Sequence, residues 1–436
     1  MQDAVALPTN EIAVLKELQK LLQNSGHLKE GESIPLRLAS DADNHDRGIP
    51  AIAAYIENNT IVALSLRYAA LLALPDSMGQ LANLRQLDLT GNNLASLPPS
   101  LKNLTNLKRL YLDENRLTSF PEWLEDLTAL EELHLDENGL ASLPENIGKL
   151  ANLQTLHLYG NRLVSLPAAL GQLTRLKELS VRGNRLTSLP EALWQLTNLQ
   201  VLYLGENPLS SLLESIGHLT NLTELYAHNS DLTALPDGIG NLTKLHTLDI
   251  GHNQLTSLPE SLGNLQRLTH FLYISDNQLA SLPKSLENLR NLKYLGITHN
   301  QFAALPEPIG SMTSLRELRL YNNQLTTLPG FIGNLTSLRE LHAMNNRLVS
   351  LPSSLGKLAS LTHLDLRNNQ LTSLPESLSA LANLAYLDLR GNRFVSLPAT
   401  IGDLPNLKKL DLRWNKLSSL PTWIRRLEQH GCTVYR

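Results

Sequence analysis

Apolar and polar positions alternate in a fixed pattern along most of the chain. From Leu84 the sequence reads LRQLDLTGNNLASLP, and from Leu107 it reads LKRLYLDENRLTSFP. A degenerate first copy starts at Ile61, which gives sixteen units over residues 61–429. The pattern returns at Leu130, Leu153, Leu176, Leu199, Leu222, Leu245, Leu268, Leu292, Leu315, Leu338, Leu361, Leu384 and Leu407. A constant period of this length predicts an array of stacked units, each of which buries its apolar side against the next.

Each unit predicts a short strand followed by a helical turn. In L-x-x-L-x-L alternate side chains point inward, as in a β-strand. In the L-P-x-x-L/I-x-x-L segment, proline suits the first turn of a short helix or 3₁₀ turn. Strands lie about 4.8 Å apart and helical backs need more room. We therefore expect a curved α/β solenoid with a parallel β-sheet on its concave face and short helical or 3₁₀ turns on its convex face.

An asparagine follows the strand in nearly every unit. A buried asparagine can donate to and accept from the backbone of its own turn and the next, which satisfies groups that the turn leaves unpaired. Ser230 replaces it once. The asparagines are Asn92, Asn115, Asn138, Asn161, Asn184, Asn207, Asn253, Asn277, Asn300, Asn323, Asn346, Asn369, Asn392 and Asn415.

This pattern resembles the leucine-rich repeat proteins. The consensus LxxLxLxxNxLxxLPxxLxxLxx is similar to the intracellular Ras-suppressor-like and plant intracellular Ras-group subclass, which is also common in bacteria. The resemblance implies a horseshoe-shaped solenoid that binds proteins on its concave face and has no catalysis of its own. The function that a fold carries still has to be argued from its site.

The two ends of the chain differ from the repeats, and we interpret residues 1–60 as an N-terminal helical cap. Residues 10–25 carry a helical spacing of apolar residues, residues 27–50 are polar and irregular, and residues 48–59 (GIPAIAAYIENN) predict a second short helix. Residues 430–436 are expected to close the other end, with Val434 as a last strand residue. The helical spacing in the first segment is that of Ile12, Leu15, Leu18, Leu21 and Leu22.

Composition excludes several classes of protein. A formal net charge of −4 disfavours a nucleic-acid binder. The single cysteine, Cys432, permits no intramolecular disulfide, and no uninterrupted apolar run is long enough to span a membrane. The N-terminal sequence MQDAVALPTNEIAVLKELQ is charged where a secretory signal is apolar. We expect a cytoplasmic monomer that binds neither nucleic acid nor membrane, with a secreted effector as the alternative location.

Function must lie in the variable positions of the concave face. Tyrosine, tryptophan and arginine are favoured at binding hot spots, whereas a face needed only for solubility would prefer lysine, glutamate, serine and threonine. The other interpretation is that tyrosine and histidine simply suit an exposed strand face. The candidate partner-binding residues are Tyr111, His134, His157, Tyr159, Tyr203, Tyr226, His228, Tyr273, Arg319, Tyr321, His342 and Trp414.

Charge on this face is segregated along the chain. Over residues 107–137 two cations stand against six carboxylates, a net charge of −4, and from residue 315 eight cations stand against five carboxylates, a net charge of +3. Such polarity could orient a complementary partner. For residues 361–413, however, the repeated Asp-Leu-Arg triplets favour intramolecular Asp–Arg ladders.

No constellation of catalytic residues is evident in the sequence. His134 and His157 share a column, and His342 and His363 form another near pair, but no cysteine or third histidine completes a zinc site. The phosphate loop GxxxxGK[ST] and the nucleophile elbow GxSxG are absent. We expect no enzyme activity, no metal and no cofactor.

One unit is a residue longer than the rest. The step from Leu268 to Leu292 is 24 residues, whereas every other step between units is 23. Counting back from Asn277 places the spare residue within 268–271, where we expect a bulge that twists the strand. Other irregularities also fall between residues 207 and 277, which is typical either of a functional centre or of drift in a redundant array.

The function that these patterns favour is a protein–protein interaction scaffold that holds a protein or peptide on its concave face. One alternative is the recognition module of a larger signalling or ubiquitin-ligase effector system whose catalytic part lies elsewhere. Another is a purely structural or designed array that binds no partner.

Overall fold

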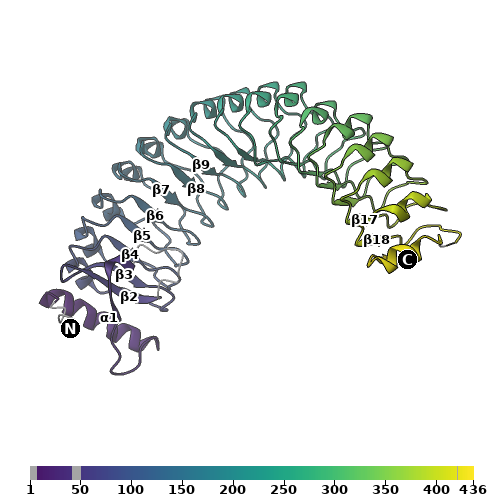
Figure 1. Cartoon of the computed structure of the whole chain (residues 1–436). Helices are drawn as coiled ribbons and strands as arrows, with labels where there is room; N and C mark the ends of the chain where they lie inside the picture. The colour runs from purple at the N-terminus through teal and green to yellow at the C-terminus, as the bar shows by residue number, and fades with distance from the viewer. Residues whose placement is uncertain (1–6, 42–50, 420) are drawn as a thin grey trace. The chain divides into compact units, whose positions relative to one another are not determined.

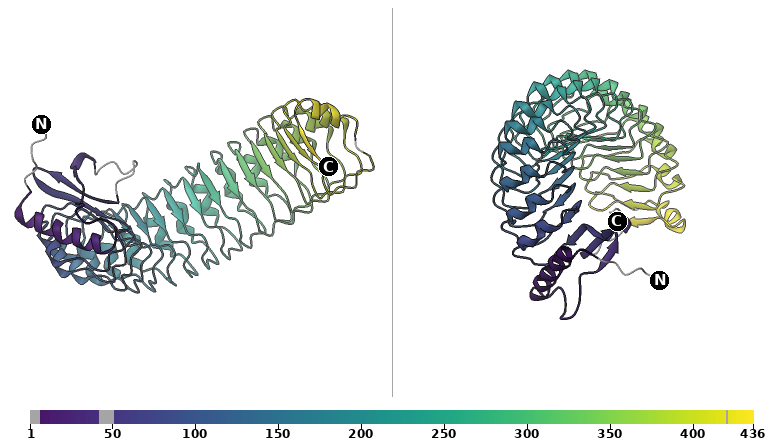
Figure 2. Two further views of the ribbon diagram at one scale, coloured as in Figure 1. Left: turned by 90° about the horizontal axis from the view of Figure 1, so that it is seen from below. Right: turned by 90° about the vertical axis from the view of Figure 1, so that its left-hand side faces the viewer.

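The computed structural model describes residues 7–41, 51–419 and 421–436; part of the predicted irregular segment, residues 42–50, lies outside this range. The chain forms two compact units, Met1–Leu209 and Ser210–Arg436, which we name unit 1 and unit 2. Within the repeats of each unit, short strands line one side and 3₁₀ helices line the other (Figures 1 and 2). This is the predicted α/β solenoid architecture.

Unit 1 begins with α1 (Thr9–Asn24), where the sequence predicts a helix. Its Glu11 carboxylate is buried and accepts hydrogen bonds from the Ile61 N–H at 2.8 Å and the Thr60 hydroxyl at 3.0 Å, which ties the helix to the first repeat. Ile12, expected on the apolar side, is instead 39% exposed. The buried apolar residues of α1 are Val14, Leu15, Leu18 and Leu22.

The second predicted helix is wrong, because this segment forms a strand. β2 (Ile52–Glu57) pairs in parallel with β1 (Leu36–Leu38) and antiparallel with β3 (Thr60–Leu66). The connecting residues Asn58 and Asn59 have φ of 49° and 58°. Two successive residues with positive φ form the kind of tight turn that joins hairpin strands, and asparagine adopts it readily.

The repeats of unit 1 add parallel strands one by one. Each strand pairs with the strand of the next repeat through equivalent residues, so that Leu87 pairs with Leu110. The inward leucines therefore stack into a continuous core. The strands are β4 (Gln86–Asp88), β5 (Arg109–Tyr111), β6 (Glu132–His134), β7 (Thr155–His157), β8 (Glu178–Ser180) and β9 (Val201–Tyr203). The 3₁₀ helices are η1 (Ala39–Asp41), η2 (Asp76–Gln80), η3 (Pro99–Asn103), η4 (Glu122–Asp126), η5 (Glu145–Lys149), η6 (Ala168–Gln172) and η7 (Glu191–Gln195).

Unit 2 continues the same construction and ends with α2 (Ile424–Gln429) and β19 (Thr433–Tyr435), in which Val434 pairs with Leu410. Its other strands are β10 (Glu224–Tyr226), β11 (Thr247–Asp249), β12 (Phe271–Tyr273), β13 (Tyr294–Gly296), β14 (Glu317–Arg319), β15 (Glu340–His342), β16 (His363–Asp365), β17 (Tyr386–Asp388) and β18 (Lys409–Asp411). Its 3₁₀ helices are η8 (Glu214–His218), η9 (Asp237–Asn241), η10 (Glu260–Asn264), η11 (Lys284–Asn288), η12 (Glu307–Ser311), η13 (Gly330–Asn334), η14 (Ser353–Lys357), η15 (Glu376–Ala380) and η16 (Ala399–Asp403). Among the helices of the described ranges, none is both long enough and apolar enough to cross a lipid bilayer.

The repeated prolines precede the 3₁₀ helices instead of opening their first turn. Pro259, for example, has extended backbone angles of φ −72° and ψ 149°, and its carbonyl accepts the Leu262 N–H at 3.1 Å. Leu213 takes the same position with φ −82° and ψ 154°, and its carbonyl accepts the Ile216 N–H at 3.0 Å. The extended geometry therefore survives the loss of one proline.

The buried asparagines form the predicted ladder, but each reaches back to the preceding repeat and not forward to the next. Asn300 donates through Nδ2 to the carbonyls of Ile297 at 3.3 Å and Ile274 at 3.0 Å, and its Oδ1 accepts the Leu279 N–H at 2.9 Å. Ser230 makes only a 3.5 Å contact with the His228 carbonyl. Asparagine suits the position because its amide has two donor hydrogens and an acceptor oxygen, which together reach backbone groups of two repeats.

The extra residue lies within the predicted range, between the turn at residues 266–267 and β12, and the predicted bulge is absent from the strand pairing. β12 pairs with β11 without a register shift, and the bend at His270 has counterparts at Glu131 and Arg316 in repeats of ordinary length. His270 donates its N–H to the His246 carbonyl at 3.0 Å, and the two imidazole rings lie 4.6 Å apart. The insertion therefore changes the segment before the strand and leaves the strand itself regular.

Candidate functional site

The last residue of each strand lies in one column on the strand face, because the register places these residues side by side. The column brings Tyr111, His134 and His157 into succession. It separates Tyr226 from Tyr273 by one strand. In unit 1 it runs through Asp88, Tyr111, His134, His157, Ser180 and Tyr203. In unit 2 it runs through Tyr226, Asp249, Tyr273, Gly296, Arg319, His342, Asp365, Asp388 and Asp411.

Unit 1 carries a cluster of aromatic and acidic side chains that we name the histidine–carboxylate cluster: Tyr111, Asp113, His134, Asp136 and His157. The ring centroids of Tyr111 and His134 are 4.8 Å apart, and those of His134 and His157 are 4.3 Å apart. The Asp113 carboxylate accepts the Asp136 N–H at 2.8 Å, so the acidic side chains also hold the backbone of the next repeat. All five side chains are half-buried.

Negative charge in this cluster is only partly compensated. Burial, reinforced by the charge of Asp136, raises the pKa of Asp113 to about 7. Burial also raises the pKa of Asp136. Burial opposes protonation of His157, but its hydrogen bond to Glu178 and the charge of Asp136 outweigh this, so the pKa of His157 is raised. The His157 Nε2 lies 3.0 Å from Glu178 Oε1. The cluster therefore favours bound protons, or a cationic partner, over the free anionic state.

Unit 2 carries an aromatic cluster made of Tyr226, Phe271, Tyr273, Tyr294 and Arg319. Ring centroids are 6.4 Å apart for Tyr226 and Phe271 and 6.3 Å apart for Phe271 and Tyr294. Tyr273 and Tyr294 stack at 6.5 Å, with an interplanar angle of 15°. The Arg319 guanidinium lies over the Tyr294 ring at 5.4 Å, a cation–π geometry. These side chains form a half-buried platform on strands β10 to β14.

Two glycines make room for this platform. A Cβ added to Gly251 would lie 2.5 Å from ring atoms of Tyr273, and one added to Gly296 would lie 2.9 Å from the same ring. The Gly296 Cβ would also lie 3.1 Å from the Tyr294 hydroxyl. The glycines therefore leave space for the tyrosine rings to pack against the backbone of the neighbouring strands.

The other predicted residues lie beside these clusters in their own units. The Arg182 guanidinium lies 5.3 Å from the Tyr159 ring, and His299 contacts Tyr321 edge-on at 5.4 Å. His228 Nδ1 lies 3.4 Å from an Asp249 oxygen, and Tyr203 is half-buried on β9.

Trp414 is the most exposed of the predicted residues, at 72%. It lies between the guanidinium groups of Arg390 and Arg413, 5.9 and 5.6 Å from its ring. Its φ of 59° is left-handed. In most repeats the residue before the ladder asparagine has a positive φ, usually as glycine, asparagine, aspartate, glutamate or histidine. A tryptophan in this conformation is unusual, and strained residues of this kind cluster at functional sites.

The predicted Asp–Arg ladder is confirmed in unit 2. Arg390 contacts Asp388 at 2.6 Å and Asp411 at 3.3 Å, and Arg413 contacts Asp411 at 2.6 Å. Burial opposes ionisation of Asp411, but the hydrogen bonds and charges of these arginines outweigh it and lower its pKa. The charged side chains of this part of the face are therefore paired with one another.

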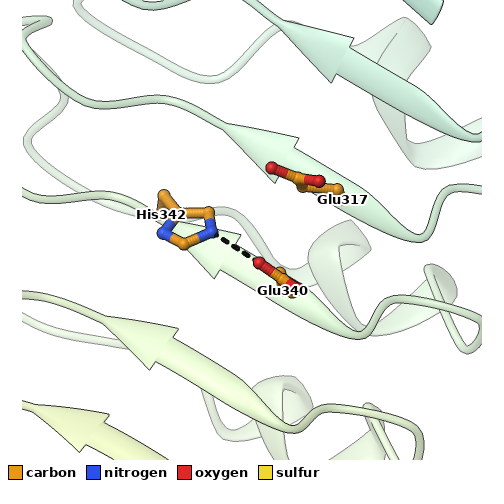
Figure 3. Close-up of side chains that lie close together, drawn as sticks. All are labelled: Glu317, Glu340 and His342. Atoms are coloured by element: carbon orange, nitrogen blue, oxygen red, sulfur yellow. Dashed lines mark hydrogen bonds and ion pairs between the residues drawn. The ribbon is translucent and has the colours of Figure 1, made fainter. Parts of the chain in front are cut away.

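Glu317, Glu340 and His342 form a group whose ligand-type atoms lie within 4.8 Å of one another (Figure 3). Arg319 already donates to Glu317 at 2.6 Å, and His342 Nε2 lies 3.1 Å from Glu340. A metal ion would have to compete with the Arg319 guanidinium for Glu317. The geometry therefore favours internal ion pairs at this position.

Two members of the aromatic cluster were missing from the sequence-based candidates. Phe271 lies next to the extra residue, where the pattern does not assign a face. Tyr294 precedes Gly296 by two residues, and the empty glycine position is what lets its ring turn toward Tyr273. Gly296, the neighbour of Tyr273 in the column, is the sequence signal that could have revealed the contact with Tyr294.

Comparison with known proteins identifies the family. A family model described as a leucine-rich repeat region matches residues 63–139, 133–231, 213–292 and 277–384, and a leucine-rich repeat model matches residues 383–404 and 406–427. No match was found among curated proteins.

Among solved structures, a leucine-rich repeat protein of Leptospira interrogans is 31% identical, with a TM-score of 0.74 over 93% of this chain and 100% of that one. The plant peptide hormone receptor RGFR1, in complex with RGF2, is 27% identical, with a TM-score of 0.59 over 85% of this chain and 72% of that one. The Toll–Spatzle complex of Drosophila gives 25% identity and a TM-score of 0.70 over 83% of this chain and 52% of that one. The chain belongs to the leucine-rich repeat family.

Proposed function

We propose that the chain is a protein-interaction scaffold that holds a protein or peptide partner on the strand face of unit 2, centred on the aromatic cluster. The observation that carries the proposal is the stacked pair Tyr273 and Tyr294, held flat by Gly251 and Gly296. Rings fixed before binding lose little conformational entropy when a partner covers them. Their hydroxyls and the Arg319 guanidinium add polar contacts at the edge of the platform.

Similarity to other members of the family supports this proposal. The similar plant receptor was solved with a peptide hormone bound, and the similar Toll protein with Spatzle. Partner binding by a repeat face needs no catalytic group in the chain itself. We also propose that the chain is a non-catalytic cytoplasmic monomer of the Ras-suppressor-like and plant intracellular Ras-group subclass, which its 23-residue consensus supports.

The test removes the platform and compares it with another stacked pair in unit 2. Tyr273→Ala with Tyr294→Ala is the test variant. His363→Ala with Tyr386→Ala is the control, because those rings also stack, at 4.3 Å. Both are used to capture partners from a lysate of the source cells, after thermal melts confirm that they fold.

The test variant should lose partner affinity by at least about tenfold, as expected for central aromatic residues. The control should keep most of it. Equal retention by both variants would remove the aromatic cluster as the binding centre.

A further inference from the structure

Three cations follow one another along the starting edge of strands β13, β14 and β15. Lys293, Arg316 and Arg339 occupy the same position in three consecutive repeats, and all three are exposed. Neighbouring strands lie about 4.8 Å apart, and like charges side by side on neighbouring strands destabilise a sheet. We name these residues the cationic strip.

The carboxylates nearest in sequence do not neutralise the strip. Glu317 pairs with Arg319 and Glu340 with His342, as Figure 3 shows for the second pair. Across the ranges that the structure describes, the side chains of the strip form no ion pair and no hydrogen bond. Its three positive charges are therefore available to an external anion.

The same repeat position in unit 1 behaves differently. Lys108 Nζ lies 2.8 Å from Glu131 Oε1, and Lys177 Nζ donates to Gln154 Oε1 at 2.8 Å. Arg85 pairs with Glu57. The repeat can therefore supply partners to a cation at this position, and in the cationic strip it supplies none.

The strip lines a groove that is larger than the pockets of ≈ 250 Å³ and ≈ 280 Å³ at the same strand-entrance positions of unit 1. In several repeats an asparagine just before the first leucine bridges to the preceding repeat, as Asn106 does to the Ala82 carbonyl at 2.9 Å and Asn198 to the Thr174 carbonyl at 2.8 Å. Beside the strip, serine takes this position in three consecutive repeats, as Ser314, Ser337 and Ser360. Together with Asn291 and Thr269, which belongs to the longer repeat, they line an open groove of ≈ 560 Å³ with the strip.

We infer that this groove binds an extended acidic peptide segment of a protein partner through its carboxylates. The row of three cations is about 10 Å long, which an extended chain covers in about three residues at 3.3 Å each. Carboxylates on alternate residues would then face the strip, and the serine hydroxyls would contact the peptide backbone. The inference rests on the proposed function, because it assigns one part of the same partner to the edge of the aromatic platform.

A long polyanion fits this surface less well than a peptide. Three cations supply few phosphate contacts, and the chain carries a net charge of −4. The groove therefore favours a short run of carboxylates.

The experiment measures fluorescence anisotropy of a labelled peptide of alternating glutamate and threonine added to the full chain. A second peptide carries glutamine in place of every glutamate. The wild-type chain should bind the glutamate peptide at least about tenfold more tightly, and salt should weaken the binding. The triple variant Lys293→Gln, Arg316→Gln, Arg339→Gln should bind both peptides alike.

The matched control removes three cations from the same repeat position in unit 1: Arg85→Gln, Lys108→Gln, Lys177→Gln. It should keep the affinity for the glutamate peptide within about twofold. Equal weakening in both triple variants, or no preference for glutamate over glutamine in the wild type, would overturn the inference. Displacement of the peptide by inorganic pyrophosphate more strongly than by unlabelled peptide would assign the groove to phosphate and overturn the carboxylate assignment.

The variant Tyr273→Ala, Tyr294→Ala separates the two proposals. It should bind the glutamate peptide normally, because both rings lie outside the groove lining. If the peptide binds the strip while this variant still captures every cellular partner, the groove stands and the aromatic centre fails. If the variant loses its partners while the peptide ignores the strip, the aromatic centre stands and the groove fails.

Discussion

The strand faces of unit 1 and unit 2 are built from the same repeat, but their carboxylates differ in whether cations pair with them. In unit 1 the carboxylates of Asp113 and Asp136 are half-buried, and burial raises their pKa values. In unit 2 the carboxylate of Asp411 is fully buried between Arg390 and Arg413, and its pKa falls. The backbone register is the same in both units, so the side chains at a few variable positions decide the difference. Unit 1 retains uncompensated negative charge, whereas unit 2 pairs Asp388 and Asp411 with arginines and leaves uncompensated positive charge on the cationic strip.

The largest expected effect comes from breaking the ladder of unit 2. Asp411→Ala leaves Arg390 and Arg413 without their shared buried partner, and we expect the free energy of unfolding to fall by about 3 kcal/mol. Urea denaturation followed by circular dichroism measures the change. Asp403→Ala removes an exposed partner of Arg426 and should cost less than about 1 kcal/mol. Equal losses in the two variants would mean that the ladder is no more than a surface feature.

The aromatic platform should be the next most sensitive part of unit 2. In Gly296→Val the new side chain would meet Tyr273 and Tyr294, so the rings must move, at a cost of about 2 kcal/mol. Near-ultraviolet circular dichroism reports the ring movement and urea denaturation reports the cost. Gly330→Val is the control, because a Cβ at Gly330 meets no atom within 4 Å. An unchanged aromatic spectrum in Gly296→Val would show that the rings are not held by the glycine.

The fold can be predicted from the sequence because the same strand and turn residues recur in every repeat. Alternating leucines specify the strands, and the asparagine specifies a buried turn that only a donor–acceptor side chain can satisfy. The cap is less predictable, because residues 52–57 carry no repeated pattern, and the turn at Asn58 and Asn59 makes them a strand.

The candidate site is predictable by column but not by contact. The column of Tyr111, His134 and His157 follows directly from the period. The stacking of Tyr273 on Tyr294 depends on the space above Gly296, which a one-dimensional pattern does not contain. Whether a cation is paired depends on the same position of the next repeat, which holds Glu131 beside Lys108 and Arg316 beside Lys293.

In unit 1, removing a charge should stabilise the protein, which is the opposite of the result expected for Asp411. The pKa of Asp113 is about 7 in the folded state, above its value in the unfolded chain, so the folded state holds the proton more tightly. Stability should therefore fall as pH rises from about 4 to 7. Asp113→Asn keeps an oxygen for the Asp136 N–H and removes the charge. At pH 8 it should be more stable than wild type by about 1 kcal/mol after allowance for solvent screening.

Urea denaturation at pH 5 and pH 8 tests this prediction. The difference between Asp113→Asn and wild type should be larger at pH 8 than at pH 5, because wild type loses stability between the unfolded and folded pKa values of Asp113. Asp126→Asn, an exposed substitution on η4, should leave the pH dependence of stability unchanged. A destabilised Asp113→Asn at pH 8 would mean that Asp113 contributes through its charge and that the two units do not differ in sign.

The smallest expected effect concerns how His157 is held. Its raised pKa means that it stabilises the folded state most below the ordinary histidine value and loses this contribution as pH rises through the folded value. Glu178→Gln removes its hydrogen-bonded carboxylate, and the pKa of His157 should fall. Titration of the imidazole C–H signals by nuclear magnetic resonance measures the shift, with the exposed Glu122→Gln as control. A pKa that stays raised in Glu178→Gln would mean that the carboxylates of Asp113 and Asp136 suffice to hold the proton. The carboxylates of unit 1 would then act on His157 together, in contrast to the discrete ion pairs of unit 2.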